Sequence, residues 1–201
     1  MSLCSRPSCL ACPLAKTGRG AALDSRVFSM YFQLVTYIKG SGSLMLTPLH
    51  RPNLSVLLAT WFGVGHLPGM PGTWGSLAAL PLWWLLASLS CWPYLGAVAL
   101  LAGAAVPLCG QAEATLARPD APEIVLDEVV GQLVALAACD GSWGQIVLGV
   151  LLFRGFDILK PFPIRWANDR VPGGFGIVLD DVLAGMGAGF SLVVLSRWLL
   201  W

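Results

Sequence analysis

Charged residues are scarce in this sequence of 201 residues: they form 11% of it, whereas 56% of the residues are hydrophobic. Soluble domains carry about a quarter of their residues as charged side chains, so the composition argues against an ordinary water-exposed surface. The formal net charge is only +1. Because no basic stripe is present to neutralise a phosphate backbone, nucleic acid is excluded as a partner. These absences favour a protein that resides in a membrane.

Histidine is limited to His50 and His66, which restricts the metal chemistry that the chain can support. Three of the six cysteines cluster at Cys4, Cys9 and Cys12. A zinc site there would need a fourth ligand at metal spacing, and neither histidine stands in such a position. The other three cysteines lie inside apolar segments, where we expect them to be small buried residues.

The first 44 residues lack a long apolar run and carry five basic residues against a single acid. A secretory signal peptide would need a continuous apolar core followed by a small-residue cleavage site, and the segment shows neither. We therefore expect residues 1–44 to be a poorly ordered N-terminal extension and residues 45–201 to form a membrane domain.

No charged residue occurs between His66 and Glu113, and the apolar runs there and beyond predict helices. We expect five long ones near residues 75–91, 94–111, 122–138, 144–160 and 176–199, each approaching the length of about 20 residues that crosses hydrocarbon. Pro93 separates the first two, and Pro161 ends the fourth. Residues 53–65 predict a short amphipathic or re-entrant helix. The predicted fold is thus all-α, a polytopic membrane helical bundle.

Lysine and arginine are distributed unevenly over the predicted links between these helices. Six lie at or before Arg51, one lies in the 112–122 link and three lie in the 160–175 link, whereas the 92–93 and 139–143 links have none. Because cytoplasmic loops carry the excess of positive charge, this alternation places the N-terminus inside. Nearly all unusual polar residues then collect on the cytoplasmic side.

Two segments of the chain resemble each other: IVLDEVV at 124–130 and IVLDDVL at 177–183 agree at five of seven positions. Gly131 follows Asp127 by four residues, and Gly185 follows Asp181 by four, so each glycine shares a helix face with a carboxylate. Such small residues allow close contact between helices. Chance similarity within apolar sequence is one interpretation; the other is that two like helices bring paired carboxylates together.

Buried carboxylates that lie close together repel one another unless a positive charge compensates. Magnesium suits such a place because it prefers hard oxygen ligands. The alternative is salt bridges to Arg154, Lys160 and Arg165, but the acids outnumber these bases, so we favour magnesium. Arg154, Asp157 and Lys160 recur at intervals of three on one helix and suit a phosphate site. The Pro71–Ser76 turn, with Thr73 or Ser76 as a helix cap, would offer N–H groups to an anion.

Several known phosphatase strategies are absent from the sequence. No cysteine is followed by arginine at the Cys-x5-Arg offset, no Asp-x-Asp-x-Thr/Val stretch occurs, and Asp140-Gly141 does not continue as Asp-Gly-x2-Ala-Arg. The two histidines also stand outside any phosphohistidine arrangement. Metal-assisted hydrolysis, in which a carboxylate activates water, is the chemistry that remains.

Four blocks, PGTWGSLAALP, EIVLDEVVG, FRGFDILKPFPIRW and GGFGIVLDDVLAG, occur in one order along the chain. In these blocks, from about Leu54 to Gly189, the chain resembles the phosphatidylglycerophosphatase A family. The resemblance implies a magnesium-dependent enzyme that hydrolyses phosphatidylglycerophosphate to phosphatidylglycerol and phosphate at the cytoplasmic face of a bacterial inner membrane. Residues 45–201 would be its domain, and residues 1–44 have no counterpart in the family pattern.

The resemblance also implies roles for individual residues. The metal ligands would be Asp127, Glu128, Asp180, Asp181 and Glu123. The catalytic residues would be Asp157, Asp127, Arg154 and Lys160. The substrate would be bound by Thr73, Gly75, Ser76, Arg154, Lys160 and Arg165. The alternative is a membrane cation transporter or channel component that uses the same intramembrane carboxylates as an ion path.

Overall fold

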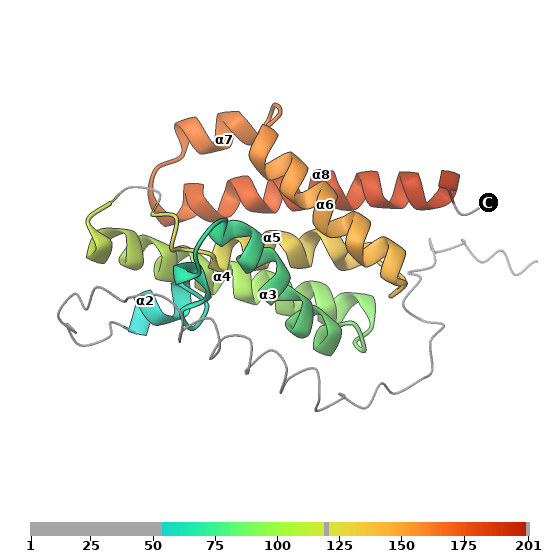
Figure 1. The fold of residues 1–201 in the computed structure, drawn as a ribbon, viewed down its shortest axis with the longest axis horizontal. Coiled ribbons are helices and arrows are strands. Elements are labelled where there is room, and N and C mark those ends of the chain that lie inside the picture. The colour runs from blue at the N-terminus through green and yellow to red at the C-terminus, as the bar shows by residue number, and fades with distance from the viewer. Residues whose placement is uncertain (1–53, 119–120, 200–201) are drawn as a thin grey trace, which may run out of the picture.

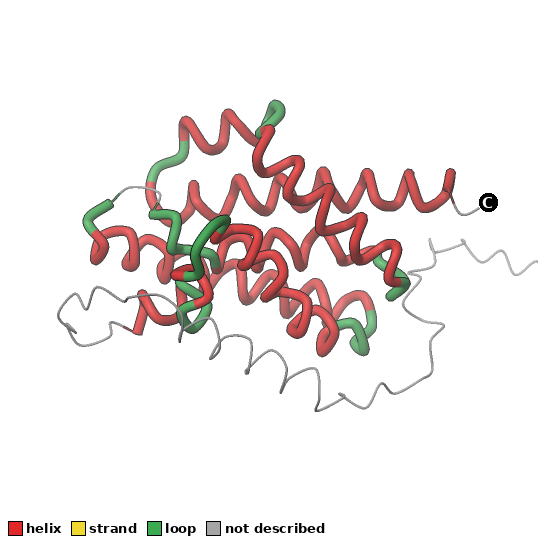
Figure 2. Tube along the Cα trace, viewed as in Figure 1, coloured by secondary structure: helices red, strands yellow, loops and turns green. Residues whose placement is uncertain are grey.

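A computed structural model describes residues 54–118 and 121–199, and the elements among them are all helical (Figure 1, Figure 2). The α-helices are α2 (Leu54–Ala59), α3 (Pro71–Leu86), α4 (Cys91–Leu116), α5 (Leu126–Ala135), α6 (Trp143–Leu159), α7 (Ile164–Arg170) and α8 (Gly173–Leu199). Two 3-10 turns, η2 (Val64–His66) and η3 (Leu136–Ala138), complete the list. The prediction of an all-α protein is confirmed, and the extension predicted at 1–44 lies outside the described residues.

Two of the described helices, α4 and α8, are long and apolar enough to cross a membrane. Helices α3 and α6 have 16 and 17 residues, and α5 has only 10. At 1.5 Å per residue, α5 is about 15 Å long, roughly half the thickness of the hydrocarbon layer. The structure therefore supports two spans by length, and the bundle of five long helices stays a prediction.

Helices α3 and α4 begin earlier than predicted, and proline explains both differences. Helix α3 begins at Pro71 itself, so the segment Pro71–Ser76 is its first part instead of a turn before it. Helix α4 begins at Cys91, so Pro93, which was predicted to separate the first two helices, lies in the first turn of the second. In both places the N–H that proline lacks would have had no helical partner. The structure also places a helix that was not predicted, α7, after the Lys160–Pro163 segment.

The predicted cap of α3 by Thr73 or Ser76 is wrong. The residue before the helix is Met70, which makes no side-chain cap hydrogen bond. The Ser76 hydroxyl lies inside the helix and donates to the Gly72 carbonyl at 2.9 Å. Its hydrogen-bonding capacity is thus used within α3.

Helix α5 ends inside the bundle, and two aromatic side chains from other helices satisfy its last carbonyl groups. The Tyr94 hydroxyl of α4 donates to the Leu133 carbonyl at 2.6 Å, and the Trp83 indole N–H of α3 donates to the Leu136 carbonyl at 3.1 Å. Both aromatic residues are buried. Since the carbonyl groups at a helix end have no partner within the helix, these bonds allow a short helix to end among apolar side chains.

The two similar segments lie against each other, because α5 packs on α8 through glycines. A methyl group on Gly185 would collide with the Gly131 carbonyl, and one on Gly189 would lie 3.2 Å from the Ala135 carbonyl oxygen. The helix contact predicted from the repeated motif is thereby confirmed. It brings the carboxylates of the two segments to the same place.

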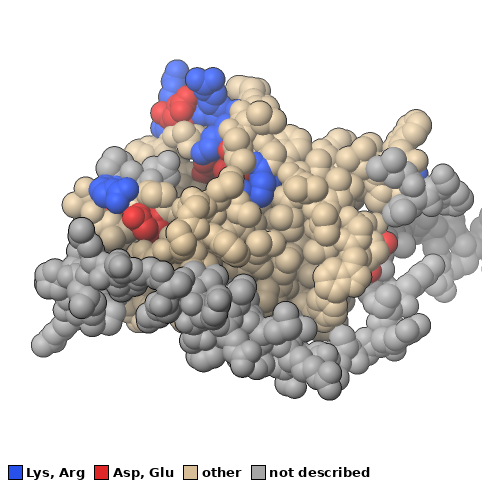
Figure 3. Space-filling view, viewed as in Figure 1, with Lys and Arg blue, Asp and Glu red and all other residues tan. Residues whose placement is uncertain are grey.

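Most charged residues of the helices meet at one end of the bundle, and Arg197 in the last turn of α8 lies away from it. The starts of α3, α5 and α8 and the ends of α4 and α6 come together near α7 (Figure 1). On the face shown in Figure 3, acidic and basic side chains gather over this end, and the middle of the described surface is without charge. The fold therefore collects in space the polar residues that lie far apart in the sequence.

Candidate active site

A cavity of about 470 Å³ opens where these helix ends meet. Four elements supply its charged lining: the end of α4, the start of α5, the end of α6 and the first turns of α8. The charged residues that line it are Glu113, Asp127, Glu128, Asp157, Lys160, Asp180 and Asp181. Six carboxylates around one lysine make the cavity strongly acidic.

Three of these carboxylates form one group. An oxygen atom of Asp127, one of Glu128 and one of Asp181 lie within 4.8 Å of one another. Asp127 and Asp181 are only 8% and 3% exposed. Because three negative charges at this separation repel one another and have little water around them, the arrangement calls for a compensating cation.

Two oxygen atoms of this group lack hydrogen-bond partners in the part of the chain that the structure describes. They are Oδ1 of Asp127 and Oε2 of Glu128, and both are buried. Buried polar atoms are normally satisfied, so orphaned oxygens indicate a ligand that would complete them. Carboxylate oxygens are the ligands that magnesium prefers. The residues present therefore fit a hard divalent cation.

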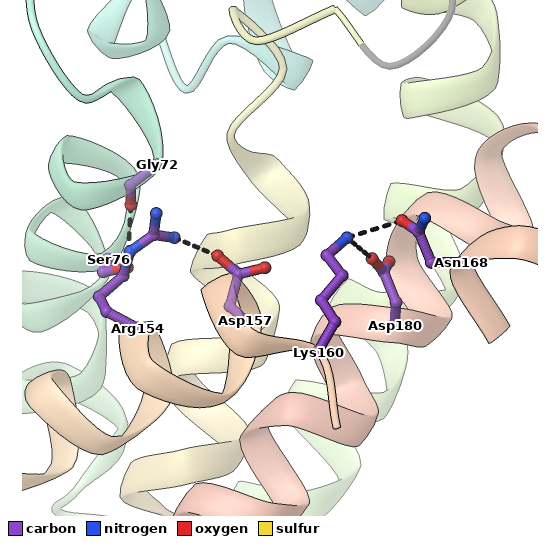
Figure 4. Close-up of polar contacts among 7 residues, drawn as sticks. All are labelled: Gly72, Ser76, Arg154, Asp157, Lys160, Asn168 and Asp180. Carbon is purple, nitrogen blue, oxygen red and sulfur yellow. Dashed lines mark hydrogen bonds and ion pairs between the residues drawn. The ribbon is translucent and has the colours of Figure 1, made fainter. Parts of the chain in front are cut away.

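Lys160 stands beside this group and joins three elements (Figure 4). It caps α6 in a left-handed conformation, with φ of 40°, and its ammonium group donates to Asp180 of α8 at 2.5 Å and to Asn168 of α7 at 2.6 Å. Burial of the Lys160 ammonium opposes its charge, but the hydrogen bond and the negative charge of Asp180 outweigh burial and raise its pKa. Lys160 is therefore a cation at neutral pH.

Arg154 lies between α3 and the cavity (Figure 4). It donates to Asp157 at 2.6 Å, and the side chains of both residues are only 16% exposed. Its guanidinium group lies against Gly72, where an added methyl group would come within 2.7 Å of a guanidinium nitrogen and 2.5 Å of a Glu128 oxygen. A side chain at Gly72 would therefore have to displace the ends of the Glu128 and Arg154 side chains.

Three residues predicted as ligands or substrate contacts lie outside the group of three carboxylates. Asp180 lines the cavity but pairs with Lys160 instead of completing the group of three. Glu123 pairs with Arg118 at 3.3 Å. The side chain of Arg165 is 78% exposed, is 3.7 Å from Asp169 and does not line the cavity. The structure thus divides the predicted residues into a group of three carboxylates and separate ion pairs.

The predicted residues of α3 contribute by close approach. A methyl group on Gly75 would lie 3.3 Å from the Glu128 side chain and 2.9 Å from Val125. Neither Thr73 nor Ser76 lines the cavity. The start of α3 therefore forms a wall behind Glu128 and Arg154.

Two lining residues with polar side chains were missed by the sequence analysis. Asn168 holds Lys160 from a helix that was not predicted, and no sequence signal indicated it. Glu113 of α4 also lines the cavity. A signal for Glu113 did exist, because it is the first charged residue after a long uncharged run.

Comparisons of the sequence with known proteins point to one family of enzymes. The family model for phosphatidylglycerophosphatase A matches residues 57–196. The chain is 41% identical to a phosphatidylglycerophosphatase A of Haemophilus influenzae over 160 residues, which is 78% of this chain and 93% of that protein. It is 40% identical to one of Escherichia coli over 144 residues, 71% of this chain and 84% of that protein.

A third relative carries a different name. The chain is 34% identical over 161 residues, 76% of this chain and 99% of the relative, to a putative phosphatidylinositol-3-phosphatase of Bacteroides thetaiotaomicron. No solved structure shows a significant match. The family model spans every residue of the acidic group, and the chain belongs to the phosphatidylglycerophosphatase A family and is a phosphatase.

Proposed function

We propose that this protein is a magnesium-dependent phosphatase that hydrolyses phosphatidylglycerophosphate to phosphatidylglycerol and phosphate. The observation that carries the proposal is the group of three carboxylates, with two orphaned buried oxygens, in the wall of a cavity that also contains Lys160. The names of the Haemophilus and Escherichia relatives support the choice of substrate.

Asp127, Glu128 and Asp181 would hold the magnesium ion. When bound, magnesium would withdraw charge from phosphate oxygens and make a coordinated water more acidic. Metal ligands must be deprotonated, so these buried carboxylates would bind the ion in their charged form only when magnesium is available. We therefore expect activity to rise with the magnesium concentration.

The other residues of the cavity would handle the phosphate and the protons. Lys160 would neutralise a phosphate oxygen as a point charge, and Arg154, which stands behind the cavity lining beside Asp157, would offer its planar N–H groups. Asp157 would accept a proton from the attacking water, since it lines the cavity and Arg154 fixes its orientation. As the water oxygen bonds to phosphorus, the bond from phosphorus to the glycerol oxygen breaks, and this oxygen takes up a proton to become the product hydroxyl.

We also propose that the protein lies in the bacterial inner membrane as a multi-pass bundle, with the cavity on the cytoplasmic side. Helices α4 and α8 have the length of spans, and the shorter α3, α5 and α6 would pack around them within the bilayer. The gathering of charge at one end of the bundle supports this orientation, as does the excess of lysine and arginine in the links at that end.

A second substrate class is suggested by the Bacteroides relative, whose name indicates a phosphorylated inositol lipid. Both substrates present a phosphate monoester on a lipid headgroup, so the same acidic group would serve either. The transporter expected as an alternative finds no support, because the relatives are phosphatases and the charged residues gather at one end of the bundle.

The test is phosphate release by the purified protein in detergent, with phosphatidylglycerophosphate and phosphatidylinositol 3-phosphate offered separately. We expect release from the first lipid, dependence on magnesium, loss with EDTA, and loss in Asp127→Asn and Asp181→Asn. Asp169→Asn is the matched control, because this carboxylate is 54% exposed on α7, and it should retain activity. Normal turnover in both of the first two variants would contradict the metal site, and release from the inositol lipid alone would contradict the substrate.

A further inference from the structure

Gln132 is a polar residue that the proposed reaction does not use and whose position needs an explanation. It lies in α5, its side chain has no exposed surface, and neither Oε1 nor Nε2 has a hydrogen-bond partner among the described residues. A buried amide without partners destabilises a fold, because no hydrogen bond compensates for the loss of water around its polar atoms. An apolar residue at this position would stabilise the protein more, so a role other than stability is indicated.

The place of Gln132 follows from its neighbours along α5. Glu128, one turn before it, lies against Gly72 of α3 and Arg154 of α6. Leu136, one turn after it, contacts Gly149 of α6, and its carbonyl binds Trp83 of α3. Residues four apart lie on the same side of a helix, with Cβ atoms about 5–6 Å apart. Gln132 therefore faces the seam between α3 and α6, one turn deeper than Glu128.

Two further orphaned atoms occur on this seam, and their chemistry complements that of the amide. Among the described residues, Glu128 Oε2 is an acceptor without a donor, and Arg154 Nε is a donor without an acceptor. An amide group supplies both functions, because its nitrogen donates and its oxygen accepts. One glutamine can thus link Oε2 of Glu128 to Nε of Arg154, whose other nitrogen Nη1 already donates to Asp157.

We propose that Gln132 is the positioning residue that couples the metal ligand Glu128 to the phosphate-binding Arg154. Its Nε2 donates to Glu128 Oε2 and its Oε1 accepts from Arg154 Nε once Glu128 is drawn to a bound cation. The proposal rests on the proposed function, because it assigns Glu128 to the metal and Arg154 to the phosphate. Hydrogen bonds to metal-ligating carboxylates commonly change metal affinity by about 10-fold to 100-fold.

The experiment compares Gln132→Met, which has nearly the same shape without hydrogen bonds, with the unsubstituted protein in detergent. Mn²⁺ serves as the probe, with binding followed by electron paramagnetic resonance, and thermal unfolding is recorded in EDTA. We expect Gln132→Met to bind Mn²⁺ about 10-fold to 100-fold more weakly. Its metal-free form should unfold at the same temperature or a higher one, since two unsatisfied buried atoms are removed. A purely structural role predicts a lower unfolding temperature and unchanged affinity.

Two further variants make the comparison specific. Leu133→Met changes the next buried residue of α5 and should leave Mn²⁺ affinity unchanged. Gln132→Asn keeps the amide on a shorter side chain and should restore part of the affinity that Gln132→Met loses. Equal Mn²⁺ affinity in Gln132→Met and the unsubstituted protein would overturn the inference. If the unsubstituted protein binds no Mn²⁺, the magnesium proposal itself fails, and the inference fails with it.

Discussion

Gly131 of α5 lies directly against the backbone of Asp181 in α8: a methyl group on Gly131 would come within 2.7 Å of the Asp181 carbonyl oxygen. The same methyl group would approach the Phe153 ring of α6 to 2.5 Å. The short distance between the two helices is what brings Asp181 to Asp127 and Glu128. A side chain at Gly131 must therefore separate Asp181 from Asp127 and Glu128.

Gly131→Ala should lower both stability and activity. Overpacking of a close contact costs about 1–3 kcal/mol, and the displaced Asp181 should weaken magnesium binding. Thermal unfolding and the magnesium dependence of phosphate release would measure the two effects. Gly103→Ala is the control, because a methyl group at this position of α4 meets no atom of the described residues within 4 Å. If both variants behave alike, the close approach of α5 and α8 does not set the geometry of the site.

The contact between α5 and α8 could be predicted from the sequence because each helix carries its own signal for it. Both segments place a glycine one turn after a carboxylate, and this local pattern survives in the structure. The boundaries of α3 were harder to predict. Gly72 and Gly75 suggested a turn, whereas the structure needs them within a helix that approaches Glu128 and Arg154. Tertiary contact overrides local propensity at such positions.

The partners of Lys160 could not be predicted for a different reason. Its contacts reach Asn168 and Asp180, which lie 8 and 20 residues away and belong to two other helices. Residues that share one helix face can be paired by counting, and Arg154 with Asp157 is such a pair. Contacts that depend on how a chain returns after two prolines have no periodic signal. The sequence therefore predicted the gathering of Asp127, Glu128, Asp157, Lys160, Asp180 and Asp181 but not the contacts of Lys160 with Asp180 and Asn168.

The contact between Lys160 and Asp180 should be important for folding as well as for catalysis. Asp180 is 5% exposed, so Lys160→Met leaves a buried carboxylate with less compensation and should cost about 1–3 kcal/mol. The double variant Lys160→Met with Asp180→Asn should be more stable than the sum of the two single variants predicts. Chemical unfolding of all four proteins would measure the coupling. Additive effects would contradict a stabilising pair.

The pH dependence of that contribution follows from the direction of the Lys160 pKa. Burial lowers the pKa of Lys160, but Asp180 and the nearby carboxylates raise it by more than burial lowers it. The folded-state pKa therefore lies above the ordinary value of 10.5. The contribution is complete below the ordinary pKa and is lost as pH rises through the folded-state pKa. The stability difference between the unsubstituted protein and Lys160→Met should therefore be constant from about pH 7 to about pH 9 and decrease only above about pH 10.5. A decrease already near neutral pH would contradict this assignment.

Arg154 and Arg165 should differ sharply in their effect on activity. Arg154 is mostly buried beside Asp157 and Gly72, whereas Arg165 is 78% exposed on α7. Arg154→Lys keeps the charge but loses the planar set of donors, so we expect turnover to fall by about 100-fold. Arg165→Lys should have little effect, since an exposed ion pair contributes about 0–1 kcal/mol. Initial rates of phosphate release at saturating lipid would measure the turnover of both variants. A similar loss of turnover in the two would mean that Arg165 contacts the substrate after all.

The end of α5 should be sensitive to the removal of a single hydroxyl group far from the cavity. Tyr94→Phe removes the donor to the Leu133 carbonyl and leaves that buried oxygen without it, at a cost of about 1–3 kcal/mol. Since Tyr94 does not line the cavity, activity well below the unfolding temperature should be retained.

Trp92→Phe is the control for this variant, because Trp92 is 83% exposed at the start of α4. It should unfold at the temperature of the unsubstituted protein, and Tyr94→Phe several degrees lower. Equal unfolding temperatures for all three proteins would mean that the Tyr94 hydroxyl does not stabilise the end of α5. A loss of turnover in Tyr94→Phe at low temperature would mean instead that the end of α5 positions its first turn, where Asp127 and Glu128 lie.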